Sequence, residues 1–130
     1  MEHWTIVGIV LLILVIAAIG VARPWGEDNW IKDSRGVWVR HGNPSKVPDY
    51  VKEQQKLIDD ALVLYSNSLV SGMEFDSQCL GVAGGYSIDI VHVPRSDEDD
   101  LAENQCLEFL NGEVSHFIEL DKKGNVVRIV

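Results

Sequence analysis

Residues 49–71, DYVKEQQKLIDDALVLYSNSLVS, form the stretch of sequence that decides the fold. Apolar residues recur in it at three- and four-residue spacing, which is typical of a helix with one buried face. These residues are Val51, Ile58, Ala61, Leu62, Tyr65 and Leu69. Pro48 suits the first helical turn and Gly72 suits the position just after the helix end. The pattern predicts one long amphipathic helix that packs on a sheet.

Strand-like runs lie on both sides of this helix. They comprise residues 36–40, 78–83, 86–93, 113–120 and 125–130. Gly84-Gly85 separates two of them and readily takes the positive φ angles of a two-residue hairpin turn. Asp121-Lys122-Lys123-Gly124 separates the last two and favours a second hairpin. We therefore predict an α+β fold, with the helix packed on a mostly antiparallel sheet of about four or five strands.

The segment between the hairpins favours a second, short helix. Ser96 and Asp99 have the spacing of a capping box, and Gly112 can end a helix that runs to Leu110. Asn104-Gln105 interrupts the pattern, so a partly irregular segment explains the sequence nearly as well.

The N-terminal stretch Thr5 to Ala22, TIVGIVLLILVIAAIGVA, contains no charged residue over 18 positions. A helix of that length covers roughly 27 Å, which is close to the hydrocarbon thickness of a bilayer. Trp4 and Trp25 flank the stretch, where indole rings favour the headgroup region. The sequence thus predicts a transmembrane helix and contact with the lipid bilayer through residues 5–22.

Two other interpretations of this stretch stay open. Gly20-Val21-Ala22 offers small residues for cleavage of a secretory signal, and a buried soluble helix is a further alternative. The apolar run exceeds the length of a signal core, and Met1-Glu2-His3 contains no Lys or Arg, so an uncleaved signal-anchor is favoured. The predicted organisation is a transmembrane anchor over 1–23, a juxtamembrane linker over 24–35 and a small α+β domain over 36–130.

The two signals for membrane orientation disagree. Arg23, Lys32 and Arg35 follow the apolar stretch, and the positive-inside rule would keep the domain in the cytoplasm. The cysteine pair, Cys79 and Cys106, is typical of an oxidising compartment. We predict a single-pass membrane protein whose soluble domain lies outside the cytoplasm.

Cys79 and Cys106 are the only cysteines of the chain and form no CxxC pattern. A disulfide between them is the simplest prediction, and two unlinked buried thiols are the alternative.

The chain is acidic, with 11 Lys and Arg residues against 20 Asp and Glu residues. A surface of this sign repels phosphate backbones, and no basic stripe reverses the effect locally. Composition therefore argues against a nucleic-acid partner.

The histidines raise the possibility of a metal site. His41, His92 and His116 are placed at expected strand ends, where Asp89 or Glu119 could join them as a ligand. Their spacing matches no specific motif, and alternation places His92 and His116 beside aliphatic residues, as for ordinary core or edge histidines. A small metal-dependent hydrolase that uses His92 and His116 is an alternative function.

The acidic run at residues 97–100 partly matches a calcium loop. Asp97, Asp99 and Glu108 fall at loop positions one, three and twelve. Leu101 and Ala102 stand where that loop needs an oxygen donor and a glycine, so calcium is not predicted.

Nucleophilic residues are present without any family signature. A Cys–His or Ser–His–Asp set can be assembled from Cys79, Ser87, Asp89, His92 and Ser115. No nucleophile elbow or phosphate loop accompanies them. We predict no catalytic residue and no cofactor.

Two resemblances bear on function. A hydrophobic N-terminal helix followed by a small α+β head with one cysteine pair resembles the general plan of type IV pilins and pseudopilins, although the Gly-Phe processing junction is missing. The phrases DSQCLG, DIVHVPR, ENQC and SHFIELDKKGNVVRI resemble segments of small, uncharacterised membrane-anchored proteins of archaeal type. The first resemblance implies an assembly subunit, whereas the second implies no activity.

The sequence as a whole favours a non-enzymatic interaction or structural module. The apolar stretch, the cysteine pair and the lack of a reactive signature all point to it. A protein partner is consistent with this interpretation, but no residue pattern identifies one.

Overall fold

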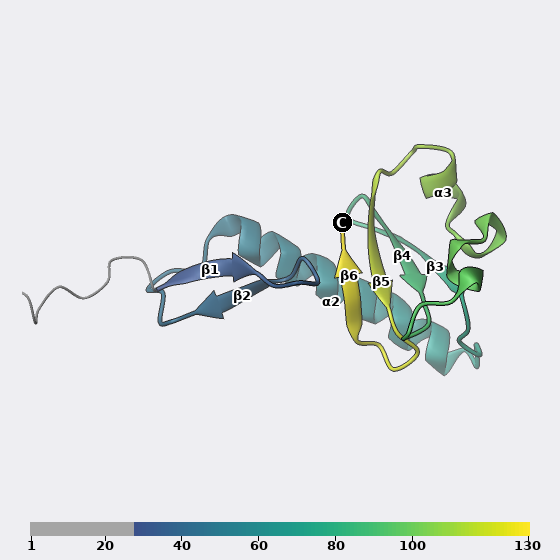
Figure 1. The fold of residues 1–130 in the computed structure, drawn as a ribbon, viewed down its shortest axis with the longest axis horizontal. Helices are drawn as coiled ribbons and strands as arrows, with labels where there is room; N and C mark the ends of the chain where they lie inside the picture. Colours follow the sequence, from purple (N-terminus) through teal and green to yellow (C-terminus); the bar gives the residue numbers. More distant parts are fainter. Residues whose placement is uncertain (1–27) are drawn as a thin grey trace, which may run out of the picture.

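The computed structural model describes residues 28–130, which form an α+β fold with a long helix and two sheets. In chain order the elements are β1 (Asn29–Lys32), β2 (Trp38–His41), α2 (Asp49–Val70), β3 (Gln78–Ala83), β4 (Tyr86–Ile90), two 3-10 turns η1 (Asp97–Asp100) and η2 (Ala102–Asn104), α3 (Leu107–Leu110), β5 (His116–Leu120) and β6 (Val126–Ile129). Helix α2 runs along one side of the four-stranded sheet and extends beyond it beside β1 and β2 (Figure 1).

Helix α2 confirms the predicted amphipathic helix almost to the residue. Pro48 occupies the N-cap, and Gly72 follows the helix with a φ of 82°. The buried face differs from the expected one, because Leu57 is buried whereas Leu69 is 53% exposed. Leu57 lies four residues before Ala61 and therefore on the same side of the helix, but the predicted face does not include it.

The main sheet has the strand order β3-β4-β5-β6. Both predicted hairpins are confirmed, since β3 pairs antiparallel with β4 and β5 pairs antiparallel with β6. The central pair, β4 and β5, is parallel, with Tyr86 opposite His116 and Ile90 opposite Leu120. A parallel pair needs a crossover connection, and residues 91–115 supply it through η1, η2 and α3.

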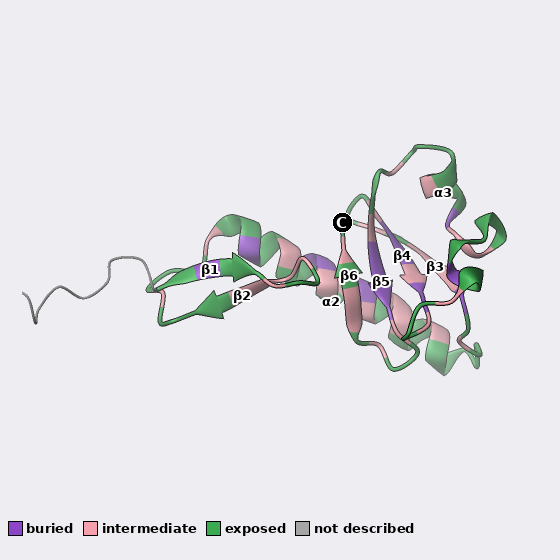
Figure 2. Cartoon of the chain, in the orientation of Figure 1, coloured by how far each residue is buried: buried purple, intermediate pink, exposed green. Residues whose placement is uncertain are grey.

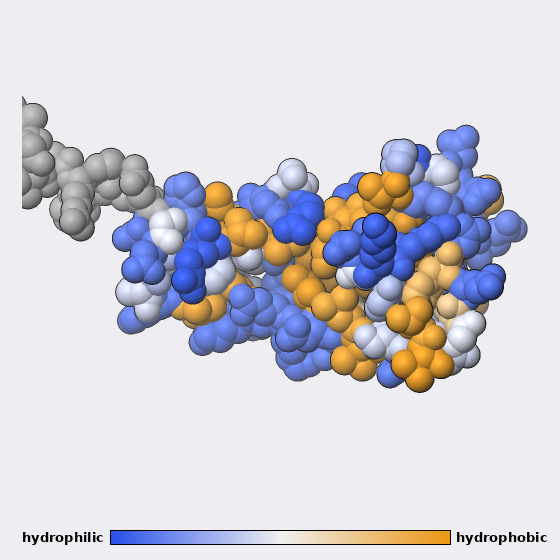
Figure 3. Space-filling view, turned by 90° about the horizontal axis from the view of Figure 1, so that it is seen from below, coloured by the Kyte–Doolittle hydropathy of each residue, from blue (hydrophilic) through white to orange (hydrophobic). Residues whose placement is uncertain are grey.

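The core lies between α2 and the two central strands. Ile88, Ile90, Ile118 and Leu120 are at most 1% exposed and pack with Leu57 and Ala61 of the helix. Figure 2 shows the buried residues concentrated in β4, β5 and the facing part of α2. Figure 3 shows a different face, on which the hydrophobic surface lies mainly in the half away from β1 and β2.

The predicted fold class is wrong in its arrangement of the strands. The strand expected near residues 36–40 does not join the main sheet, because β2 pairs with β1 in a separate two-stranded sheet. β1 lies within the segment 24–35, for which a linker is predicted. Helix α2 holds this ribbon through Gln54, which accepts a hydrogen bond from the Trp38 N–H and donates one to the Gly36 carbonyl.

The predicted fold class also includes a membrane-spanning helix, which the described residues do not contain. Among residues 28–130, no helix is both long enough and apolar enough to cross a bilayer. The stretch predicted to do so, residues 5–22, lies outside the described residues.

The crossover from β4 to β5 is largely irregular rather than one short helix. The capping box is present, with the Asp99 carboxylate accepting the Ser96 N–H at 2.9 Å. It begins only the four-residue turn η1, and a helix re-forms only at Leu107–Leu110. The extended backbone of Leu101 and Gln105 breaks the helical path.

Candidate functional site

The parallel pairing of β4 and β5 creates the most distinctive surface of the domain. The carboxyl ends of β4 and β5 lie side by side at one end of the sheet. From there the backbone continues into residues 91–96 and 121–125. In open sheets with parallel strands, ligands favour the crevice outside such ends. An open cleft of about 610 Å³ lies here, and its lining includes His92, Ser96 and Lys122.

Five polar residues meet beside this cleft and form what we call the His92 cluster: Asp76, His92, Ser96, Glu98 and Asp99. They come from three segments, namely the residues before β3, the residues after β4 and the turn η1. The sheet and the crossover therefore bring together residues that are more than 20 positions apart in the sequence.

Asp99 fixes the orientation of the His92 ring. Its side chain is fully buried and accepts hydrogen bonds from the backbone N–H groups of His92 and Ser96, and from His92 Nδ1 at 2.9 Å. Burial alone would raise the pKa of Asp99, but the backbone donors and the His92 ring outweigh burial and lower it. The ionised carboxylate can only accept, so Nδ1 carries a proton.

The other ring nitrogen, Nε2, faces a second carboxylate. It lies 2.7 Å from Asp76 Oδ1, which also forms an ion pair with Lys122 at 3.3 Å. The hydrogen bond from Lys122, followed by that from His92, lowers the pKa of Asp76. The hydrogen bond to Asp99 is the main reason that the pKa of His92 is raised, and Asp76 adds to it. The imidazolium form is thus favoured.

Three residues of the His92 cluster offer metal-ligand atoms within 4.8 Å of one another: Asp76, His92 and Glu98. Within residues 28–130, Glu98 is exposed, and its hydrogen bonds to Ser77 and Asn104 use the backbone carbonyl, which leaves the carboxylate without a partner. Ligating histidines commonly donate their second ring N–H to a carboxylate, which fixes the tautomer and makes the ligand nitrogen more basic. Asp99 stands in that position at Nδ1, and Nε2 faces the Asp76 carboxylate.

The cluster does not form a Ser–His–Asp triad. In such a triad the serine and the carboxylate bind opposite nitrogens of the histidine ring. Here Ser96 Oγ and Asp99 both contact Nδ1, at 3.0 and 2.9 Å. His92 therefore cannot take a proton from Ser96 while Asp99 orients it.

The structure does not bring the predicted metal ligands together. His116 pairs with Tyr86 at the start of the parallel strands, whereas His92 follows their far end, six residues further along. At about 3.3 Å per residue, the two histidines are roughly 15 to 20 Å apart. His116 stacks on the Tyr86 ring, and His41 ends β2 in the separate ribbon. His92 alone of the three lies in the His92 cluster.

The calcium alternative is also not supported by the positions of its residues. Asp99 directs its carboxylate to His92 and Ser96. No grouping of ligand atoms from Asp97, Asp99 and Glu108 occurs in the part of the chain that the structure describes.

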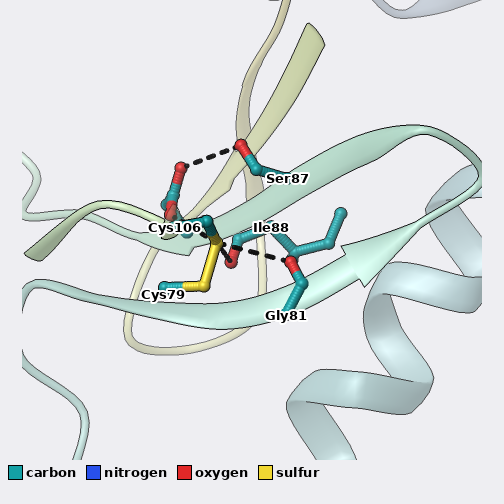
Figure 4. The surroundings of a disulfide bond; sticks show 6 residues. Cys79, Gly81, Ser87, Ile88 and Cys106 are labelled. Carbon is teal, nitrogen blue, oxygen red and sulfur yellow. Dashed lines mark hydrogen bonds between the residues drawn. A yellow bond between two sulfur atoms is a disulfide. The ribbon is translucent and has the colours of Figure 1, made fainter. Parts of the chain in front are cut away.

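The predicted disulfide is confirmed. Cys79 on β3 is bonded to Cys106, which directly precedes α3. Figure 4 shows the bond beside β4, with Cys106 facing Gly81 and Ile88. The bond ties the crossover to the edge of the main sheet.

Asp89 lies in a second polar environment, which we call the Asp89 pocket. Its lining includes Asp89, Arg95, Phe117, Glu119 and Arg128, and its volume is about 180 Å³. The Glu119 carboxylate is 6% exposed and binds both Arg95 and Arg128, at 2.8 and 2.9 Å. Among residues 28–130, no Lys or Arg forms an ion pair with Asp89, and burial, followed by repulsion from Glu119, raises its pKa to about 6.

Asp89 is therefore expected to make stability depend on pH. Its folded pKa exceeds its unfolded value, so the folded state binds the proton more tightly and loses stability as pH rises from about 4 through 6. We expect Asp89→Asn to raise the free energy of unfolding at pH 7 by about 1 to 3 kcal/mol, with a much smaller gain at pH 4. Urea denaturation at the two pH values measures this, and an equal effect at both would contradict it.

Comparisons with protein-family models, curated proteins and solved structures found no match. A function is therefore proposed from the geometry of the His92 cluster.

Sequence reasoning identified His92 as a candidate ligand but missed its partners. Asp76 lies in an irregular stretch, and Glu98 and Asp99 carry the signature of a helix start. The capping box was the one available signal, because it fixes where the Asp99 carboxylate points.

Proposed function

We propose that the domain is a binding module for a divalent transition-metal ion, held by His92, Asp76 and Glu98. The observation that supports this most strongly is the convergence of their ligand atoms within 4.8 Å, together with the hydrogen bond between His92 Nδ1 and the buried Asp99. Ligand type favours zinc, since imidazole and carboxylate groups both bind it and three protein ligands leave one position open.

The charges of the cluster favour a divalent ion. Asp76, Glu98 and Asp99 supply three negative charges, which imidazolium His92 and Lys122 do not fully balance. A metal ion would displace the proton from Nε2. The ion and Lys122 would then balance the three carboxylates, while Nδ1–H stays bonded to Asp99.

The proposal also covers the compartment in which this module works. The Cys79–Cys106 disulfide supports a working place outside the reducing cytoplasm. Contact of residues 5–22 with a lipid bilayer, an assembly role like that of pilins and a protein partner stay predictions from the sequence. A hydrolase that uses His92 and His116 together is not favoured, because they lie at opposite ends of the parallel strands.

Zinc titration of the full chain without a histidine tag tests the proposal by isothermal calorimetry. We expect one ion per chain and at least a tenfold loss of affinity in His92→Gln, because the sole nitrogen ligand is removed. Affinity should rise with pH through the pKa of His92, since binding displaces a proton. Lys122→Met should bind zinc more tightly, because it removes the ammonium that competes for Asp76.

His116→Gln is the matched control, because it removes a histidine outside the His92 cluster. It should bind zinc as the wild type does. Equal affinity in wild type and His92→Gln, or a loss in His116→Gln alone, would reject the proposed site.

A further inference from the structure

The contact between Asp89 and the disulfide suggests an activity beyond metal binding. Asp89 Oδ1 lies 3.4 Å from Cys106 Sγ, and Asp89 pairs with Cys79 across strands β3 and β4. We propose that the Cys79–Cys106 disulfide is a reducible redox site, in which Asp89 supplies the proton that Cys106 needs when the bond is cleaved.

The exposure of the two cysteines determines which sulfur an incoming thiolate attacks. Cys79 is partly exposed on strand β3, whereas Cys106 is 1% exposed. An incoming thiolate can therefore reach Cys79 more readily than Cys106. Attack at Cys79 makes Cys106 the leaving sulfur.

The surroundings of Cys106 make a bare thiolate unfavourable. Besides Asp89, its Sγ contacts the carbonyl oxygens of Gly81 at 3.5 Å and Ile88 at 3.8 Å (Figure 4). These oxygens can accept a hydrogen bond from a thiol but repel a negative sulfur. The leaving sulfur therefore needs a proton as the bond breaks.

Asp89 can deliver that proton from solvent. Its carboxyl contacts the buried sulfur and also lines the Asp89 pocket, whose volume of about 180 Å³ has room for water. Burial and the nearby Glu119 raise the pKa of Asp89 to about 6, so a useful fraction is protonated near neutral pH. The same carboxylate can accept the proton again on reoxidation.

The proposed reaction balances with a dithiol as the reductant. One thiolate of the dithiol attacks Cys79 Sγ, the Cys79–Cys106 bond breaks, and Cys106 leaves as a thiol with the proton of Asp89. The second thiol of the dithiol, as its thiolate, then attacks the mixed disulfide and releases Cys79, which takes up a proton from solvent. The protein disulfide gains two electrons, and the dithiol becomes a disulfide.

Reduction kinetics of the full chain with dithiothreitol test the role of Asp89. The readout is the mass increase after thiol alkylation, from pH 5.5 to 8, with each rate divided by the concentration of dithiothreitol thiolate. For wild type, we expect this normalised rate to fall up to about tenfold per pH unit above pH 6, following the protonated fraction of Asp89. For Asp89→Asn, it should not vary with pH and should be at least about tenfold lower at pH 6.

Asp97→Asn is the matched control, since it removes an exposed carboxylate at the start of η1. It should keep the wild-type pH profile, whereas a merely structural effect of Asp89→Asn would shift all rates without changing their pH dependence. A normalised wild-type rate that does not vary with pH, a wild-type profile in Asp89→Asn, or no reduction of the folded protein would each overturn the proposal.

Discussion

Removal of the Cys79–Cys106 disulfide is expected to lower the free energy of unfolding by about 3 to 4 kcal/mol. The bond joins residues 27 positions apart, so its loss frees a long loop in the unfolded chain. A domain of this size has a total stability of about 5 to 10 kcal/mol, of which this is a large share. The crossover would then no longer be tied to β3.

Urea denaturation of the Cys79→Ala/Cys106→Ala double variant at pH 7 measures this contribution. The reduced and alkylated wild type also lacks the disulfide and provides a second measurement of its contribution. A change below about 1 kcal/mol in both would contradict a stabilising role for the disulfide.

Truncation of Ile118 to alanine is expected to cost about 3 to 5 kcal/mol. Ile118 is fully buried on β5, between Ile88 of β4 and Ile129 of β6 in the sheet register. It belongs to the core cluster that includes Ala61 of α2. The variant loses buried apolar surface and leaves a cavity between the sheet and the helix.

Leu69→Ala is the control for this substitution, because Leu69 is 53% exposed on α2. Its free energy of unfolding should stay within about 0.5 kcal/mol of wild type. Similar losses for Ile118→Ala and Leu69→Ala would show that the core does not lie where the structure places it.

Local signals in the sequence predicted the elements better than their pairing. The apolar spacing of 49–71 and Gly72 define a helix, and Gly84-Gly85 defines a hairpin, because each depends on residues close in sequence. The parallel contact of β4 with β5 depends on the path of 91–115, which no local pattern specifies. The β1–β2 ribbon was missed for the same reason. Its hydrogen bonds to Gln54 of α2 join residues that are 16 and 18 positions apart in the sequence.

The candidate site was predictable only in part, for the same reason. His92 was identified by residue type, and Ser96 with Asp99 by the capping box. The convergence of Asp76 with His92 depends on the antiparallel pairing that places the start of β3 beside the end of β4. His116, the alternative partner of His92, lies at the opposite end of the parallel strands, because residue type does not say at which end of a sheet two residues lie.

The central claim is that Nε2 of His92 is a metal ligand while Nδ1–H stays bonded to Asp99. Nitrogen-detected NMR of the ¹⁵N-labelled full chain tests it directly at pH 6, before and after one equivalent of zinc. We expect both ring nitrogens of His92 to be protonated at first, and only Nε2 to lose its proton and shift when zinc binds. Unchanged His92 signals, or zinc-dependent shifts at His116 or His41 instead, would contradict the claim.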